Sequence, residues 1–187
     1  MNEVLKTIAQ RSSIRAYTDE RLTDAEIRAV VTAGLQAPTA RNAREIHFTV
    51  FDGNNPLLAE IDRECKLSML ESVTDAEARA KIENNPNNFY YSAPTVVILS
   101  VDKDFFWNKL DVGIAVENMS LAAQSMGLGS LIIGIIDKAM RGEKSEYFAK
   151  SLKFPENYEF AIAFAVGHKN TEKEPHEIDF DKDVSIL

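Results

Sequence analysis

The stretch Arg11-Ser12-Ser13-Ile14-Arg15 places two guanidiniums and two hydroxyls within five residues, close to the start of the chain. Guanidinium groups bind phosphate through paired hydrogen bonds, and hydroxyls add donors that carry no charge. This spacing predicts a cradle for an anion, and phosphate fits it best. The alternative is a solvated basic turn that follows a short helix, and five residues alone leave both interpretations open.

Composition limits the classes of protein to which the chain can belong. It has 187 residues, of which 45% are apolar and 27% charged, as in an ordinary globular domain with its own core. The net charge of −8 argues against a nucleic-acid or membrane-surface binder, because phosphate backbones and anionic lipids attract excess Lys and Arg. We therefore expect one domain over residues 1–187, with small-molecule ligands.

Targeting and redox signals favour the cytoplasm. Cys65 is the only cysteine, so an internal disulfide is impossible and a reducing compartment is expected. The segment Met1–Lys6 lacks the basic and long apolar regions of a signal peptide. The strongest apolar run, Leu131–Ile136, is interrupted by Gly134 and is too short to cross a bilayer.

Helices and strands are expected to alternate along the chain. Thr23 and Glu26 have the spacing of a capping box, which predicts a helix start, and Pro38 limits where that helix ends. Alternating or continuous apolar runs predict strands. We expect helices at Glu3–Gln10, from Thr23 to before Pro38, and at 56–71, 75–83, 108–126 and 142–151, and strands at 47–51, 95–101, 130–136 and 158–166. The tail from Gly167 is polar and lacks helical periodicity, so we expect an arm.

The side chains offer no familiar catalytic set. The sequence has no H-E-x-x-H or G-x-S-x-G pattern and no cysteine pair, and its histidines lie far apart, so no metal site is expected. Gly127-Leu128-Gly129 follows an expected helix, whereas a dinucleotide fingerprint follows a strand. If the chain is an enzyme, a cofactor must supply the chemistry, and we expect no catalytic side chain.

Five segments, taken in order and with their spacing, resemble the nitroreductase family of flavin enzymes. They are Arg11–Arg15, Ala37–Asn42, Tyr91–Pro94, Gly127–Ser130 and Ala165–Gly167. The resemblance implies an α+β fold, a three-layer α/β/α sandwich around a mixed, mostly antiparallel sheet. It further implies an intertwined homodimer with FMN at the interface, the arm 167–187 wrapping the partner subunit, and ping-pong hydride transfer from NAD(P)H to nitroaromatics, quinones or similar electrophiles.

The resemblance also assigns cofactor-binding residues. For the FMN phosphate and ribityl chain they are Arg11, Ser12, Ser13 and Arg15, with Lys173 or His176 from the tail. For the flavin of the other subunit they are Pro38, Thr39, Ala40 and Asn42. A backbone amide near Ile133 and Gly134 is expected to face flavin N5. A donor there stabilises the reduced ring without a titratable group.

Two stretches leave alternatives open. Where the family often has Gly-Asn-x-Gln-Pro-Trp, residues 41–46 read Arg-Asn-Ala-Arg-Glu-Ile. The two arginines either bind an anionic substrate or the phosphates of NAD(P)H, or form a surface pair with Glu45. This altered edge motivates a second hypothesis, a flavin-storing or flavin-sensing protein with little turnover. Phe105-Phe106-Trp107 either forms a lid or packs at the start of the long helix. A third hypothesis makes Arg11–Arg15 a protein-docking surface.

Overall fold

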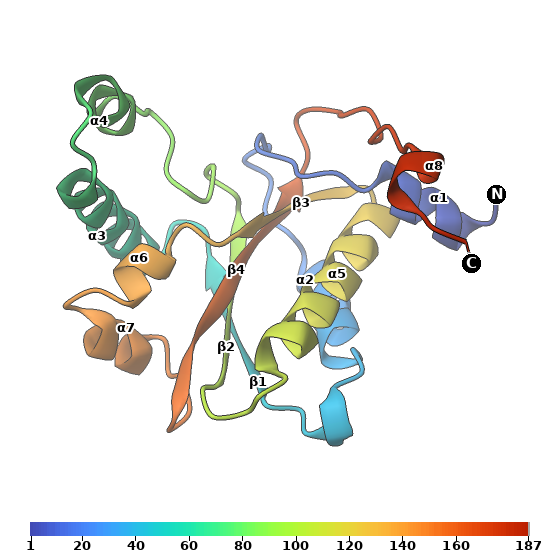
Figure 1. Cartoon of the computed structure of the whole chain (residues 1–187), viewed down its shortest axis with the longest axis horizontal. Helices are drawn as coiled ribbons and strands as arrows, with labels where there is room; N and C mark the ends of the chain where they lie inside the picture. The colour runs from blue at the N-terminus through green and yellow to red at the C-terminus, as the bar shows by residue number, and fades with distance from the viewer. Residues whose placement is uncertain (187) are drawn as a thin grey trace.

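A computed structural model describes residues 1–186 as three layers, with a four-stranded sheet between two groups of helices (Figure 1). The strands are β1 (Ile46–Asp52), β2 (Thr95–Asp102), β3 (Leu128–Ile133) and β4 (Tyr158–His168). One face carries α3 (Pro56–Ser72), α4 (Ala76–Glu83), α6 (Asp137–Met140) and α7 (Ser145–Ser151). The other carries α2 (Asp24–Leu35) and α5 (Asn108–Ser125), with α1 (Glu3–Gln10) against α5.

The central strand β2 shows why the sheet is covered on both faces. The order is β1-β2-β4-β3, and every neighbouring pair is antiparallel. Val96 and Ile98 are buried in the core that includes α3, α6 and α7, whereas Val97 and Leu99 are buried in the core that includes α2 and α5. The continuous β-branched run of β2 therefore fills two cores, as the sequence predicts.

The start of α2 confirms the predicted cap. The Thr23 hydroxyl accepts the Glu26 N–H at 3.2 Å, and the Glu26 carboxylate accepts the Thr23 N–H at 2.8 Å. These two bonds satisfy backbone donors that a helix end leaves unpaired. The expected helices at 3–10, 56–71, 75–83 and 108–126 are confirmed to within one residue or two at their ends.

The chain after α1 adds a strap, residues 11–18, along the sheet edge at β3. Ser13 forms a parallel bridge with Ser130, and the Ile14 N–H donates to the Ser130 carbonyl at 2.9 Å. Farther along, the Thr18 N–H donates to the His168 carbonyl at 2.9 Å. Among residues 1–186, the mixed character expected of the sheet is limited to this parallel bridge, and the α+β class is confirmed.

Three boundaries differ from the expectations. β3 spans Leu128–Ile133 and not 130–136, because the Gly134 carbonyl accepts the Asp137 N–H at 3.0 Å and turns the chain into α6. The helix expected over 142–151 begins at Ser145. The tail contains a short helix, α8 (Phe180–Asp183), whose start is capped by the Asp179 side chain. No helix in the described part of the chain is long and apolar enough to cross a membrane.

Candidate functional site

The strap holds the predicted anion-binding residues in a fixed place beside β3. Ser12 is buried, and the Arg11 backbone N–H caps the end of α1 through the Thr7 carbonyl. The Arg11 Nε lies 3.6 Å from a Glu117 carboxylate oxygen of α5, which is longer than a hydrogen bond. The loose pairing orients the guanidinium and leaves its donors available to a stronger anion.

Gly129 explains how closely the strap approaches the sheet. A Cβ added at Gly129 would lie 2.8 Å from the Ile14 Cγ2 and 3.0 Å from the Lys169 Cβ. No real side chain fits at these separations, so the glycine allows the two segments to touch. The Tyr17 hydroxyl adds a second clamp, since it donates to the Ile14 carbonyl at 2.8 Å. Burial raises the pKa of this phenol, which keeps its proton on the donor.

The segment Tyr91–Pro94 meets the strap at Arg15. The Arg15 guanidinium carbon lies 6.0 Å from the centroid of the Tyr91 ring, within cation–π range. Tyr91 and Ser92 both adopt a left-handed backbone with φ near 53°. The Asn88 side chain stabilises this turn by accepting the N–H groups of Tyr90 and Ser92 at 3.0 and 3.1 Å.

The turn at residues 133–137 offers backbone donors. Ile133 is buried and Gly134 is exposed. Within residues 1–186, no acceptor is found for the N–H groups of Gly134, Ile135 and Ile136, although the carbonyls of the same residues accept from Asp137, Lys138 and Ala139. The family resemblance implies a backbone N–H donor that faces flavin N5 near Ile133 and Gly134, and these open N–H groups are of that kind.

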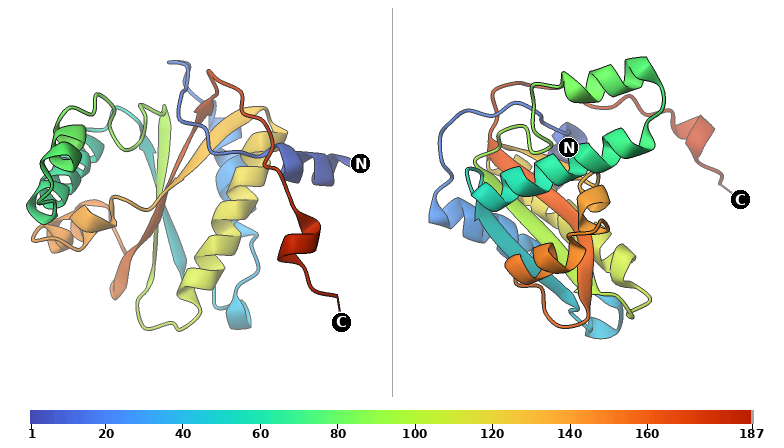
Figure 2. Two further views of the ribbon diagram at one scale, coloured as in Figure 1. Left: turned by 45° about the horizontal axis from the view of Figure 1, so that its top comes forward. Right: turned by 90° about the vertical axis from the view of Figure 1, so that its left-hand side faces the viewer.

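The segment Pro38–Asn42 lies at the opposite end of the subunit from the strap (Figures 1 and 2). The Ala40 N–H donates to both carboxylate oxygens of Asp111 at 3.0 and 3.1 Å, and Asn42 is exposed with φ 54°. One subunit therefore does not bring these predicted residues together with Arg11 and Arg15. A shared ligand would need a second subunit.

The arginines of residues 41–46 are not paired with Glu45. The Glu45 carboxylate instead accepts the Tyr158 hydroxyl at 2.7 Å, and burial together with this bond raises the pKa of Tyr158 to about 12. The Arg44 Nε donates to the Asn42 side chain at 3.2 Å. Among the described residues, no carboxylate pairs with Arg41 or Arg44, so the surface-pair interpretation is wrong for this subunit.

The predicted tail residues Lys173 and His176 lie on an exposed segment that projects from the body (Figure 2). Neither makes a hydrogen bond or ion pair with another residue of 1–186. The nearest tail contact of this kind joins Lys169 and Glu172 at 2.9 Å. The subunit alone therefore does not bring Lys173 or His176 to the strap, and their phosphate role stays a prediction.

Beside the turn lies a cavity of about 270 Å³ between α5 and the sheet. Ile162 lines it and also lies 3.6 Å from a Cβ placed on Gly134. Its walls are mainly apolar, and charged groups stand among them; the lining includes Val112, Val116, Ile132, Phe160, Ile162, Lys109, Arg141 and Glu159. Phe106 packs edge-on against Trp107, the N-cap residue of α5, so this aromatic pair lies at the helix start, although Phe106 itself is 83% exposed.

Three buried polar side chains hold parts of this arrangement, and none of them is among the site residues predicted from the sequence. They are Asp62 and Cys65 on α3 and Asp111 on α5. Asp111 carried a usable signal, since it falls on the same helical face as Asn108, Val112 and Ala115. An acidic residue on a buried face needs a polar partner.

Comparison with known proteins agrees with this geometry. A family model described as "Nitroreductase family" matches residues 8–168. A nitroreductase with bound FMN from Desulfitobacterium hafniense DCB-2 has 32% identity and a TM-score of 0.89, with both chains fully covered. A nitroreductase with bound FMN from Bacteroides fragilis NCTC 9343 has 29% identity and a TM-score of 0.88, again over both full chains.

A curated relative extends the likeness to named activities. An FMN reductase (NADPH) of Bacillus subtilis is 27% identical over 182 residues, which cover 90% of this chain and 66% of the relative. The family match spans most of the chain and includes the strap, the turn and every strand. The predicted resemblance is confirmed: this chain belongs to the nitroreductase family.

Proposed function

We propose that this protein is an FMN-dependent oxidoreductase that uses NAD(P)H to reduce nitroaromatics, quinones or related small electrophiles. The observation that carries the proposal is the pairing of a cationic strap with a turn of open N–H groups on the same sheet edge, since both adjoin β3. The FMN and NAD(P)H dependence has the further support of relatives named as FMN-bound nitroreductases and FMN reductases.

The strap residues fit an FMN phosphate by their chemistry. Arg11 and Arg15 supply guanidinium donors, and Ser12 and Ser13 supply hydroxyls and backbone N–H groups close to β3. The Arg11 partner Glu117 is held at 3.6 Å, so the phosphate meets a cation that is oriented but not fully neutralised. When bound, FMN supplies hydride transfer at N5, and the chain's own residues only hold and orient it.

The turn at Gly134 fits the ring end of the flavin. Its N–H groups are fixed dipoles that need no protonation, so their support for an electron-rich ring does not depend on pH near neutrality. Ile133 is buried below the turn and keeps it against the core. The chain therefore contributes position and electrostatics, and we assign no catalytic side chain.

We propose that the site is completed by a homodimer in which residues 167–187 embrace the partner subunit. Pro38–Asn42 cannot reach the strap of its own subunit, as described above, so in a dimer it is free to approach the flavin of the other. The tail also exposes large apolar side chains to solvent in one subunit, and Ile178 is 84% exposed. Burying such side chains against a partner is favourable.

The cavity beside the turn suits electron acceptors that are small, flat molecules. Its lining is mainly apolar, Arg141 and Glu159 form an ion pair at 3.4 Å, and Lys109 leaves the lining with one unbalanced positive charge. A ring compound such as a nitroaromatic or a quinone suits this surface better than a highly charged metabolite. Arg41 and Arg44, which have no carboxylate partner in the described chain, suit the phosphates of NAD(P)H.

The decisive experiment is the absorption spectrum of the purified protein, followed by anaerobic stopped-flow mixing with NADH or NADPH. We expect a flavin band, tight titration with FMN, rapid bleaching by the nicotinamide and reoxidation by menadione or nitrofurazone. Failure to take up FMN would contradict the proposal. Bound FMN that neither nicotinamide reduces would favour the flavin-storage alternative, which rests on the altered residues 41–46.

A further inference from the structure

Helix α3 presents two polar side chains to the interior, one helical turn apart. Asp62 is 7% exposed and Cys65 is fully buried. Buried polar groups persist in proteins because they have hydrogen-bond partners. Here each partner is a backbone group of a different segment of the candidate site, which links α3 to both ends of the proposed flavin pocket.

Cys65 reaches the turn that carries the open N–H groups. Its Sγ lies 3.2 Å from the Ile135 carbonyl oxygen, within the range of an S–H donor. A peptide group is a rigid plane that holds the carbonyl of one residue and the N–H of the next, so a fixed Ile135 carbonyl also fixes the direction of the Ile136 N–H. The thiol therefore restrains the orientation of the donor at Ile136, the last of the three open N–H groups of the turn.

Asp62 reaches the loop that supports the strap. Its carboxylate accepts the Phe89 N–H at 2.7 Å, and Lys66 pairs with it at 3.3 Å. Phe89 lies two residues before Tyr91, whose ring faces the Arg15 guanidinium. The carboxylate thereby holds the base of the turn that presents Tyr91 to the strap.

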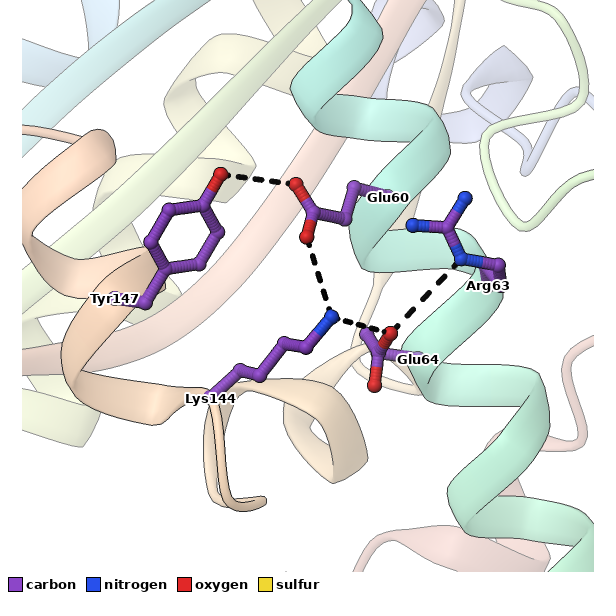
Figure 3. A network of polar contacts seen from close by, with 5 residues as sticks. All are labelled: Glu60, Arg63, Glu64, Lys144 and Tyr147. Atoms are coloured by element: carbon purple, nitrogen blue, oxygen red, sulfur yellow. Dashed lines mark hydrogen bonds and ion pairs between the residues drawn. The ribbon is translucent and has the colours of Figure 1, made fainter.

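A polar network on the outer side of α3 keeps the helix itself in place (Figure 3). The Lys144 ammonium donates to Glu64 at 2.8 Å and to Glu60 at 3.3 Å, and the Tyr147 hydroxyl donates to Glu60 at 3.0 Å. These contacts join α3 to the segment that follows α6. Because these contacts hold α3 in place, the hydrogen bonds of Asp62 and Cys65 can restrain the loop and the turn that they reach.

We propose that Asp62 and Cys65 are positioning residues of the flavin site. Asp62 sets the loop beside Arg15, Cys65 sets the turn at Ile135, and α3 joins the two contacts through one rigid helix. This inference rests on the proposed function. It assigns a role to α3, which contributes none of the five segments that carry the family resemblance.

The test for Cys65 measures the midpoint potential of bound FMN in Cys65→Ala and Cys65→Ser. A well-placed donor stabilises the reduced ring, so alanine should lower the potential by about 15 to 30 mV, a three- to tenfold change in a two-electron equilibrium. Serine keeps a donor, so the potential of Cys65→Ser should differ from that of wild type by less than about 9 mV, which is a twofold change in the two-electron equilibrium. The control is Ile61→Val, which trims a buried α3 side chain that makes no such bond.

The test for Asp62 measures the dissociation constant of FMN in Asp62→Ala and Asp62→Asn. Alanine leaves the Phe89 N–H without an acceptor, and we expect about fivefold weaker binding, whereas asparagine keeps an acceptor and stays within about twofold. In the Arg15→Ala background the alanine effect should fall below about twofold, because coupled residues do not act additively. A purely structural role would lower stability without this coupling.

Each outcome decides the proposal. Equal potentials in Cys65→Ala and wild type, a Cys65→Ser potential as low as that of alanine, or additive Asp62 and Arg15 effects would each overturn it. If an alanine variant does not fold, Cys65→Val or Asp62→Leu replaces it, since each fills the volume without the polar group. A wild type that takes up no FMN would instead overturn the proposed function itself.

Discussion

The backbone N–H of Ala40 donates to both carboxylate oxygens of Asp111, at 3.0 and 3.1 Å, across 71 residues of sequence. Asp111 is 2% exposed and lies in the first turn of α5, where a negative charge is favoured by the helix dipole. This single side chain anchors Pro38–Asn42, the segment that we expect to reach the flavin of a second subunit. Its removal should therefore affect both folding and cofactor binding.

For Asp111→Ala we expect a loss of about 1 to 3 kcal/mol in the free energy of unfolding, because the Ala40 N–H keeps no acceptor. Denaturant titration of the apoprotein measures this loss. FMN titration of the same variant should show weaker binding, since the loop loses its anchor. Asp111→Asn keeps one acceptor, so its stability and its FMN affinity should lie between those of wild type and Asp111→Ala. An alanine variant as stable as wild type would contradict this role.

For Gly129→Ala we expect the strap to be displaced from β3. The new Cβ would lie 2.8 Å from the Ile14 Cγ2, and such overpacking typically costs about 1 to 3 kcal/mol. The thermal midpoint should fall and FMN binding should weaken together. The matched control is Gly113→Ala in α5, where no atom beyond the chain neighbours and the helix's own backbone lies within 4 Å of the new Cβ. That substitution should stabilise the helix by about 0.5 to 1 kcal/mol.

Local sequence signals predicted most of the elements, and their failures have physical causes. The Thr23 capping box and the β2 run determine structure from neighbouring residues, so both were found. The run Leu131–Ile136 is apolar on both sides of Gly134 and predicts one strand, yet the chain turns within it because the Gly134 carbonyl accepts the Asp137 N–H. Hydrophobic pattern does not encode that bond.

The candidate site was predictable only where the ligand itself leaves a residue pattern. Arg11 and Arg15 are visible because phosphate requires cations. The bond between Cys65 and the Ile135 carbonyl joins residues that are 70 positions apart, and its acceptor is a backbone oxygen that any residue type would supply. Contacts of this kind, including that of Asp62 with Phe89, require the folded chain to be seen.

For Arg11→Ala and Arg15→Ala we expect about tenfold or greater weakening of FMN binding, since a charged hydrogen bond contributes about 1.5 to 3 kcal/mol. Wild-type binding should also weaken as salt is raised, because screening reduces the attraction between guanidinium and phosphate. Arg63→Ala removes an arginine from the outer side of α3 and should bind FMN normally. Unchanged flavin content in the two strap variants would instead support the docking-surface hypothesis for Arg11–Arg15.

For Cys65 we expect an alkaline loss of stability. Burial, with a smaller contribution from Asp62, raises the thiol pKa from 9.0 to about 11, so the native state favours the protonated form. That contribution is complete below pH 9 and is lost as the pH rises toward 11, at about 1.4 kcal/mol for each pH unit. Denaturation of wild type and Cys65→Ser at each pH measures the difference. A constant difference between them from pH 8 to 11 would refute the expected titration.

Deletion of residues 171–187 tests the arm and keeps Lys169 and Asn170, whose backbones pair with the strap at Tyr17 and Ala16. These residues follow β4, and the large apolar side chains Ile178 and Ile186 in them are each 84% exposed in one subunit, so the subunit's own core should survive their loss. We expect near-native circular dichroism, but a shift from dimer toward monomer in sedimentation velocity and weaker FMN binding, because the partner loses the apolar contact that the tail supplies. The matched variant Ile178→Asp with Ile186→Asp keeps the tail length and should reproduce the shift. A truncated protein that stays dimeric and binds FMN as wild type does would show that the tail has no part in assembly or in the site.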